Sequence, residues 1–527
     1  MAFTLLQAGA TLISINSTGG ISPPLTLPAG VTLSTTVVPR FARYKRFVIV
    51  VNTPTQPLSV DDGGIVRFLT PKAPASAVIL TAPNAGTLTG TYLARQTYRL
   101  LDVSGNVISE SDYGPAMTLP FTEANKQLIA TFPISTQTVD GTELYRTTTL
   151  GAILFPWVAV PGNITTQVQD QTADAGLGIV PGPQLGPAPD LTLIAEFEGR
   201  LWGVDRGNVD NLRYTEAGTM YAWSVLNVLP IPHIGSDAKG ITALIPRRNA
   251  LGVARLDVFQ QVTGDTRDNF RPTVVNGGEA MGCVSQESVV VYNDIAYFLW
   301  RDGVYTWTSS GIQSITNGRV RSWFTTDTYF NRSRFENAFA ELDPVTLKYR
   351  LFLSSPGSFV NDRWIEYDLM TQSWWGPHIT GAFTPSCAVL VASQTTNPFF
   401  MVGSQEGFLS QDQEDKNDWG VTPIAFSAET IKHGLTIDPE HEKYWGELTV
   451  SGKTQTAGLV AVTPIVGDTD NVPDGVPFNY DMSLGRHRLG RIGVGKRVSL
   501  RFTHSTLNQD VVLYGYEIDP VTIVGRR

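Results

Sequence analysis

The chain has 527 residues, of which 42% are hydrophobic and 10% aromatic, so it is long enough for roughly two to four domains with real cores. Only 17% of the residues are charged, and the formal net charge is −9, which excludes the strongly basic composition of a protein that grips nucleic acid tightly. Cys283 and Cys387 are the only cysteines, which excludes a disulfide framework and predicts folding in a reducing cytosol.

The sequence also argues against export signals and long helices. Residues 1–6 lack the basic start of a signal peptide. The longest apolar runs are about five residues, such as 47–51, whereas a membrane span needs about 20. The 49 Gly and 33 Pro indicate many turns, and no stretch keeps a helical period over three turns. We therefore expect an all-β protein without a membrane span.

Residues 1–70 have the composition of strands. The segment 31–38 is rich in β-branched residues, Pro39 interrupts it, and a second strand is predicted at 47–51. We expect these N-terminal strands to complete a ring that is otherwise built later in the chain.

Residues 71–176 form a separate predicted module. One long strand is expected at 91–100, with further strands at 128–132 and 142–148. This spacing suggests a sandwich of about 100 residues, and the segments 98–111 and 144–147 resemble a fibronectin type III module. An irregular β-insertion is the alternative. A Gly- and Pro-rich segment, 176–189, ends the module.

Residues 190–426 repeat a short phrase, an aromatic and β-branched strand followed by a tight turn and a second strand. The phrase begins at 198, 249, 293, 348 and 397, so the starts lie roughly 45 to 55 residues apart, the length of a four-stranded propeller blade. Asp302-Gly303 predicts one hairpin, and 363–369 with 372–375 predicts another. Because one blade cannot bury both its faces, we expect five or six blades stacked around an axis.

Residues 427–527 lose the repeat and predict a C-terminal β-domain. The expected fold is thus an all-β chain: a β-propeller with an inserted fibronectin-III-like sandwich at 71–176 and a terminal β-domain. Strands are expected at 447–450, 459–462, 497–502 and 511–518.

Signs of catalysis or metal binding are weak, so we expect no enzyme activity, no cofactor and no metal. Six scattered histidines form no metal-binding spacing: His233, His378, His433, His441, His487 and His504. The turn 59–64 begins like a sialidase-type motif but is better explained as a β-turn. The acidic run 412–418 lacks the calcium-loop pattern. Glu366 and Asp368 share one face of a predicted strand, which is commonplace.

One cluster of basic residues stands out because its sixteen-residue stretch, 486–501, contains no acid. The cluster predicts contact either with phosphates or with an acidic neighbouring subunit; a solvated hairpin is the alternative. Its members are Arg486, Arg488, Arg491, Lys496, Arg497 and Arg501.

Several segments resemble a known family. Phe197-Glu198-Gly199-Arg200-Leu201-Trp202-Gly203 is similar to blade openings in the tail nozzle (tail tubular protein B-like) proteins of short-tailed bacteriophages. The segment 281–288, followed by 295–299 and 302–305, is similar to them as well. Gly490-Arg491, 497–501 and 514–518 fit the terminal β-domain of such chains.

The resemblance implies a structural subunit of the distal tail tube, or nozzle, through which DNA is ejected into the host. It implies a homohexameric ring in the virion tail, assembled in the host bacterial cytoplasm. The implied partners are tail adaptor or neck proteins, tail fibres or spikes, and transient double-stranded DNA in the lumen. Two alternatives remain: a receptor- or glycan-binding tail-tip propeller, whose candidate aromatics are Trp300, Trp307, Trp364, Trp374 and Trp375, and a glycan-cleaving propeller enzyme.

Overall fold

The computed structural model describes most of the chain as antiparallel β-sheet, which confirms the all-β class. The described residues are 4–51, 56–102, 104–117, 121–178, 188–232, 240–316, 318, 320–380, 383–391, 398–411, 426–430, 441–455, 458–467, 475–505 and 511–524. Helical elements in these ranges are short: α1 (Arg321–Thr325), η1 (Asp174–Gly176), η2 (Gln286–Ser288), η3 (Arg332–Asn337) and η4 (Met482–Leu484). None of them has the length or apolar character needed to cross a bilayer.

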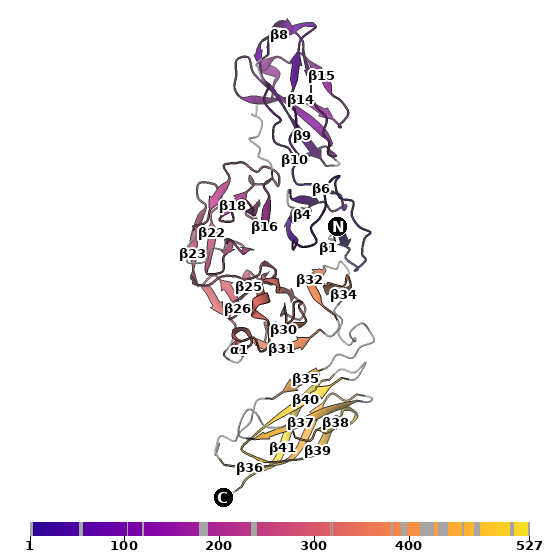
Figure 1. Ribbon diagram of the computed structural model, residues 1–527, viewed down its shortest axis with the longest axis vertical. Helices are drawn as coiled ribbons and strands as arrows, with labels where there is room; N and C mark the ends of the chain where they lie inside the picture. Colours follow the sequence, from indigo (N-terminus) through magenta and orange to yellow (C-terminus); the bar gives the residue numbers. More distant parts are fainter. Residues whose placement is uncertain are drawn as a thin grey trace. The chain divides into compact units, whose positions relative to one another are not determined.

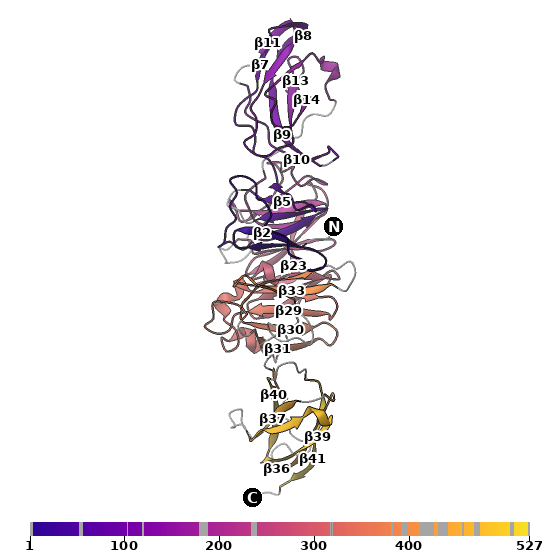
Figure 2. The same ribbon diagram turned by 90° about the vertical axis from the view of Figure 1, so that its right-hand side faces the viewer.

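The chain divides into two compact units, unit 1 (Met1–Gln411) and unit 2 (Asp412–Arg527). Figure 1 and Figure 2 show the strands of each unit from two directions.

Unit 1 contains a series of antiparallel sheets whose strands follow one another in chain order. Sheet 1 comprises β3 (Arg40–Tyr44), β4 (Phe47–Val51), β5 (Leu58–Val60) and β6 (Val66–Phe68). Sheet 2 comprises β16 (Leu191–Phe197), β17 (Arg200–Asp205), β18 (Asn211–Tyr214) and β19 (Val228–Pro230). Sheet 3 comprises β20 (Ala243–Pro246), β21 (Leu251–Ala254), β22 (Val258–Thr263) and β23 (Arg271–Glu279).

The same meander continues through the second half of unit 1. Sheet 4 comprises β24 (Val290–Tyr292), β25 (Ile295–Trp300), β26 (Gly303–Thr308) and β27 (Gly311–Ser314). Sheet 5 comprises β28 (Phe339–Asp343), β29 (Lys348–Leu353), β30 (Arg363–Asp368) and β31 (Ser373–Ile379). Sheet 6 comprises β32 (Pro385–Val391), β33 (Phe399–Ser404) and β34 (Leu409–Gln411).

Hydrophobic clusters join each sheet to the next. Ile49 of sheet 1 packs with Leu201 of sheet 2, and Trp202 of sheet 2 shares a cluster with Val253 of sheet 3. Phe259 and Phe298 link sheets 3 and 4 in the same way, and Leu299 and Leu351 link sheets 4 and 5. Phe352 and Phe400 link sheets 5 and 6. Sheets 2 to 5 therefore each pack against a neighbouring sheet on either side.

An N-terminal hairpin connects the last sheet to the first. The hairpin pairs β1 (Thr4–Ala8) with β2 (Thr11–Ile15). Ile15 packs with Val391 and Met401 of sheet 6, whereas Leu12 packs with residues of sheet 1 such as Leu58. Leu12 and Ile15 are both fully buried. The hairpin thus contacts both the first and the last of the six sheets, and Figure 1 shows β1 between sheet 1 and sheet 6.

Turn chemistry explains why the repeated phrase forms hairpins. Glu198 (φ 51°) and Gly199 (φ 64°) connect the paired residues Phe197 and Arg200, which is the two-residue turn that matches strand twist. The hairpin predicted at Asp302-Gly303 is confirmed, with Gly303 opening β26. The predicted pair 363–369 with 372–375 is confirmed as β30 and β31.

Between β6 and β16 the chain forms two packed sheets and a further strand pair. Sheet A has the order β10 (Val107–Glu110), β9 (Ala94–Leu101), β13 (Gly141–Thr147) and β14 (Leu154–Pro161). Sheet B has the order β15 (Gln167–Asp170), β12 (Leu128–Thr131) and β7 (Ile79–Thr81), and β8 (Ala85–Tyr92) pairs with β11 (Phe121–Lys126). Leu80 and Leu128 of sheet B share a core with Leu144 and Trp157 of sheet A. Similarity to fibronectin type III remains a prediction.

Two strand predictions are wrong. The expected strand at 91–100 is split at Leu93, because β8 pairs with β11 while β9 pairs with β13. The expected strand at 31–38 is not a strand. The Ser34 hydroxyl accepts the backbone N–H groups of Thr36 and Val37, and such local bonds compete with sheet pairing.

Unit 2 is a two-sheet β-structure. Sheet C has the order β35 (Phe426–Glu429), β40 (Arg497–His504), β37 (Leu459–Gly467) and β38 (Phe478–Asp481). Sheet D has the order β39 (Arg486–Gly495), β36 (Lys443–Gly452) and β41 (Leu513–Ile523). The two sheets enclose one core that includes Leu448, Val462 and Leu500. The strands predicted at 447–450, 459–462, 497–502 and 511–518 are all present, with β41 beginning at Leu513.

Candidate functional site

The predicted basic cluster lies on two strands of unit 2. Arg486, Arg488 and Arg491 are exposed on β39, whereas Arg497 and Arg501 belong to β40 and Lys496 lies in the turn between these strands. The cluster is therefore shared between sheets D and C and does not form a single face.

Neighbouring strands supply acidic partners that the linear sequence does not reveal. Arg486 pairs with Glu517 of β41 at 2.8 Å, and Arg501 pairs with Glu429 of β35 at 3.1 Å. Glu447 of β36 accepts ion pairs from Arg488 and Arg491. The acidic partners lie 31 to 72 residues away along the chain. The segment 486–501 therefore contains no acid in the sequence, although strand pairing partly compensates its positive charge in the fold.

Strand register arranges charge across the outer face of sheet D. Arg491 of β39 stands opposite Glu447 of β36, which stands opposite Asp519 of β41. In the next row, Arg488 and Glu517 flank Thr449 of β36. One edge of sheet D therefore carries basic side chains and the other edge carries acidic ones.

The short element η2, which lies between sheets 3 and 4 in the chain, contacts strands that are distant in the sequence. Gln286 of η2 accepts a hydrogen bond from the Leu244 N–H at 2.7 Å and donates one to the Leu244 carbonyl at 3.1 Å. It therefore satisfies both backbone polar groups of Leu244 on β20. Glu287 forms an ion pair with Arg40 at the start of sheet 1. Burial raises the pKa of the Glu287 carboxyl, and the Arg40 charge opposes that rise.

Contacts of η2 reach a third sheet. The Ser285 hydroxyl donates to the Ala338 carbonyl just before β28 at 2.6 Å, and the Tyr349 hydroxyl of β29 donates to the Ser288 carbonyl at 2.8 Å. The segment therefore ties sheets 1, 3 and 5 together. These polar groups are engaged in holding the sheets and are not arranged around a substrate.

A second carboxyl with a raised pKa belongs to Glu341 on β28. Burial raises the pKa of Glu341 on β28 to about 7, against the lowering effect of N–H groups from Leu342 and from Leu390 of sheet 6. A raised carboxyl pKa means that the folded protein holds its proton more tightly than the unfolded chain does. Stability is therefore highest at acid pH and falls as pH rises from about 4.5 to about 7.

Glu341→Gln should remove this pH dependence. We expect the variant to match the parent at pH 4, where the carboxyl is mostly protonated in both the folded and the unfolded state. At pH 8 we expect the variant to be more stable by on the order of 2 kcal/mol, a value reduced from 1.36 kcal/mol per pKa unit because the side chain is not fully buried. Urea midpoints measured at both pH values test this. Parallel pH profiles for the two proteins would show that Glu341 titrates normally.

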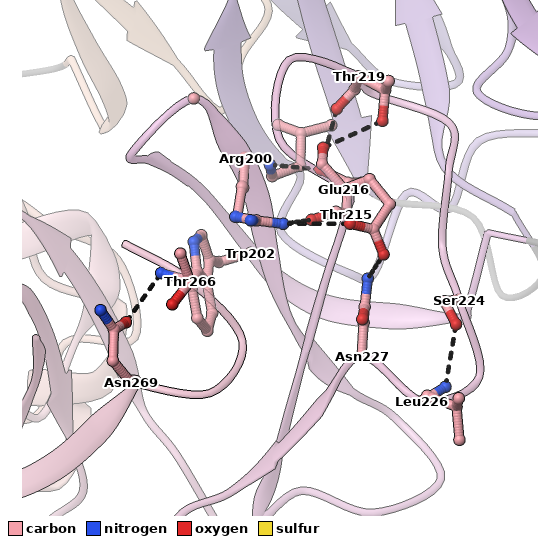
Figure 3. A network of polar contacts seen from close by, with 12 residues as sticks. Arg200, Trp202, Thr215, Glu216, Thr219, Ser224, Leu226, Asn227, Thr266 and Asn269 are labelled. Atoms are coloured by element: carbon pink, nitrogen blue, oxygen red, sulfur yellow. Dashed lines mark hydrogen bonds and ion pairs between the residues drawn. The ribbon is translucent and has the colours of Figure 1, made fainter. Parts of the chain in front are cut away.

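Figure 3 shows a polar network at the phrase that resembles blade openings. Arg200 of β17 donates to the Thr215 carbonyl at 2.8 Å and lies 3.6 Å from the Glu216 carboxylate, which accepts a bond from Asn227 at 2.7 Å. The Arg200 guanidinium also lies over the Tyr214 ring. The network fixes the loop between β18 and β19, so the phrase serves folding.

Two cavities open on unit 1. The first, about 530 Å³, is lined by residues that include Phe41, Arg43, Glu196, Glu198, Arg247 and Arg248. Glu196 accepts the Gly199 N–H at 2.9 Å, and Arg247 pairs with Asp294 at 2.8 Å. The two lining carboxylates, Glu196 and Glu198, both come from the single β16–β17 hairpin, and Glu196 is engaged by the turn that it helps to form.

The second cavity, about 550 Å³, is lined by Thr242, Leu256, Val284, Arg301, Arg332, Ser333, Phe335 and Glu336. Glu336 is the one carboxylate among these residues, which differs from the paired acids of a glycosidase site.

The candidate sugar-binding tryptophans are mostly used in packing. Trp307 is buried, Trp300 donates to the Leu256 carbonyl at 2.9 Å, and Trp374 donates to the Ile315 carbonyl at 3.0 Å. Trp364 stacks on His378 with ring centres 4.2 Å apart. Only Trp375 of this set is largely exposed, so the packing explanation holds for the other four.

The remaining candidate groups have structural roles where they are described. Asp61 accepts the N–H groups of Gly63 and Ile65, which confirms the β-turn. Glu366 pairs with Lys348 and Arg350, while Asp368 accepts turn N–H groups.

Metal-binding predictions can be checked for part of the chain. Within the described ranges, no three His, Cys, Asp or Glu side chains gather as a metal site would require. The acidic run 412–418, His233 and His433 lie outside the described residues.

Comparison with known proteins leaves the family open. No family model and no curated protein matches the chain. Among solved structures, the computationally designed protein Ika8 is 9% identical, with 73% of this chain and 98% of that one covered and a TM-score of 0.28. Exo-β-1,3-galactanase of Phanerochaete chrysosporium is 11% identical, with coverage of 66% and 97% and a TM-score of 0.22.

PorZ, a surface component of the type-IX secretion system of Porphyromonas gingivalis, is 9% identical, with coverage of 98% and 75% and a TM-score of 0.27. At these TM-scores the likenesses support no conclusion about what this chain does.

Proposed function

We propose that unit 1 is a six-bladed β-propeller and that the whole chain is a structural subunit of a bacteriophage tail nozzle. Two findings support the propeller: sheets 1 to 6 pack consecutively, and the β1–β2 hairpin packs against both sheet 6 and sheet 1. Closure by an N-terminal element would hold the first and last blades together.

The observation that best supports a structural role is that the polar side chains around η2 form bonds between sheets. Arg40, Gln286 and Glu287 link sheets 1 and 3 through η2, and the second cavity has a single carboxylate, Glu336, among the residues that line it. Polar groups that already bind one another between sheets stiffen the protein, and stiffness is what a structural subunit requires. We assign this structural role to a short phage tail because three parts of the chain resemble nozzle proteins: 197–203, 281–288 and the terminal strands.

In this proposal DNA passes between copies and not through the centre of one subunit, because η2 bridges that centre. Six copies would form a ring in the virion tail, in contact with neck proteins and with tail fibres or spikes. The net charge of −9 suits a lumen through which a duplex slides without being held. Ring interfaces of this heterologous kind usually bury more than ~2,000 Å² in obligate assemblies.

Binding of a receptor or glycan at the tail tip is the second candidate, and the exposed Trp375 is the observation that favours it.

Sedimentation velocity of the purified full chain tests the nozzle proposal. We expect one discrete species at a multiple of 57.4 kDa, six copies in the favoured case, that grows with concentration. A monomer that persists across the whole concentration range, together with binding on a glycan array, would replace the nozzle with the tail-tip lectin.

A further inference from the structure

The acidic edge of sheet D is a long strand with one described partner. β41 spans Leu513–Ile523 and, among the described residues, pairs in a ladder only with β36. Glu517 and Asp519 are exposed on its outer face, and Ile523 is 45% exposed near its end. A long strand edge of this kind is a template for a further chain.

The opposite edge of sheet D is complementary in charge. β39 presents Arg488 and Arg491, both exposed, and Val494, which is 53% exposed. Arg488 shares its row with Glu517, and Arg491 shares its row with Asp519.

Strand direction makes these two edges compatible between copies. β39 and β41 both run antiparallel to β36, so they run parallel to each other. Rotation about an axis along the strands keeps every row at its own height. Glu517 of one copy would then meet Arg488 of the next, and Asp519 would meet Arg491.

We propose that the acidic β41 edge of one copy docks along the basic β39 edge of the next copy, so that sheets D form a continuous band around the ring. The partner is a second copy of this chain, and the inference rests on the proposed ring function. The contact is heterologous, since two different edges meet, and a contact of this kind forms a ring when the rotation between neighbouring copies closes. Complementary charges set the register.

Contact with phosphates is less favoured for these arginines. Arg486, Arg488 and Arg491 each already have a carboxylate within 4.0 Å in the same subunit. Those pairs are exposed and worth little individually, so they can exchange for pairs across an interface. They nevertheless reduce the net positive potential that would hold a nucleic acid backbone.

Charge reversal in matched pairs tests the interface. The acid variant set, Glu517→Lys with Asp519→Lys, leaves both edges basic, and the base variant set, Arg488→Glu with Arg491→Glu, leaves both edges acidic. In sedimentation velocity at about 0.15 M salt, each set alone should weaken assembly at least about tenfold through like-charge contact. An equimolar mixture should restore the parent assembly, because alternating copies then present opposite charges at every junction.

Arg497→Glu provides the control, since Arg497 is exposed on β40 of sheet C and the substitution makes the same change in charge as either single Arg→Glu substitution of the base variant set. It should assemble like the parent. Restoration in the mixture also shows that both variant sets fold, which circular dichroism of each set checks independently.

The outcomes separate the interface from the ring. Parent-like assembly of both variant sets would place the interface elsewhere and overturn this inference while the nozzle proposal stands. A parent protein that never assembles would remove both. If Arg488→Glu with Arg491→Glu assembles normally but loses binding to a short fluorescent DNA duplex, the arginines serve nucleic acid and the interface proposal fails.

Discussion

Replacing Leu12 and Ile15 by alanine is expected to release the N-terminal hairpin from sheets 1 and 6. Each side chain is fully buried, one against sheet 1 and the other against sheet 6. Each substitution should lower the free energy of unfolding by about 2 to 5 kcal/mol through lost burial and a residual cavity. The two effects should add, because the side chains belong to different clusters.

The location of the damage distinguishes closure from general destabilisation. Hydrogen exchange in the double variant should rise first in β3–β6 and β32–β34, the strands that the hairpin joins. Leu128→Ala is the control, since it removes the same atoms from the core between sheets A and B. It should raise exchange in those two sheets instead. A change below about 0.5 kcal/mol for the double variant, typical of surface positions, would mean that the hairpin does not close unit 1.

Trp202→Ala is expected to be the most damaging single substitution between neighbouring sheets. Trp202 is fully buried between sheets 2 and 3, stacks on Tyr214 with centroids 4.6 Å apart and meets Phe270 edge-on at 4.8 Å. Its loss should cost about 3 to 5 kcal/mol. Denaturant unfolding followed by circular dichroism measures the effect.

Trp202→Phe separates ring packing from hydrogen bonding at the same position. The indole N–H donates to the Phe197 carbonyl at 3.1 Å, and phenylalanine would lose this bond while keeping an aromatic ring. The loss of the bond contributes about 1 kcal/mol and the smaller ring adds a limited cavity, so this variant should lie well above Trp202→Ala in stability. Equal losses for the two variants would assign the role to the hydrogen bond and not to the packing.

Local structure was predictable where it depends on turn residues and strand composition. The hairpin at Asp302-Gly303 and the β-turn at Asp61 follow from residues within a few positions of one another. The failure at 31–38 has the same local scale, because β-branched composition favoured a strand whereas the Ser34 hydroxyl bound the neighbouring backbone. The split at Leu93 depends on which partners β8 and β9 select, information that no single segment contains.

Long-range contacts account for what sequence analysis missed. The role of Gln286 and Glu287 depends on Leu244 and Arg40, far away in the chain, and nothing in the segment 281–288 marks it as a bridge. The basic cluster was found in the sequence as a run without acids. Strand pairing then brought Glu447 and Glu517 beside it, and only the register of sheet D shows the separation of charge between its two edges. That register could have been anticipated only by pairing the strands correctly first.

Electron microscopy of the purified full chain, at concentrations where sedimentation detects assembly, tests the central claim most directly. We predict class averages of a closed ring with an open lumen, in which every subunit contains a six-bladed propeller whose own centre is filled. Isolated particles under all conditions, or subunits in which sheet 6 stands apart from sheet 1, would contradict it.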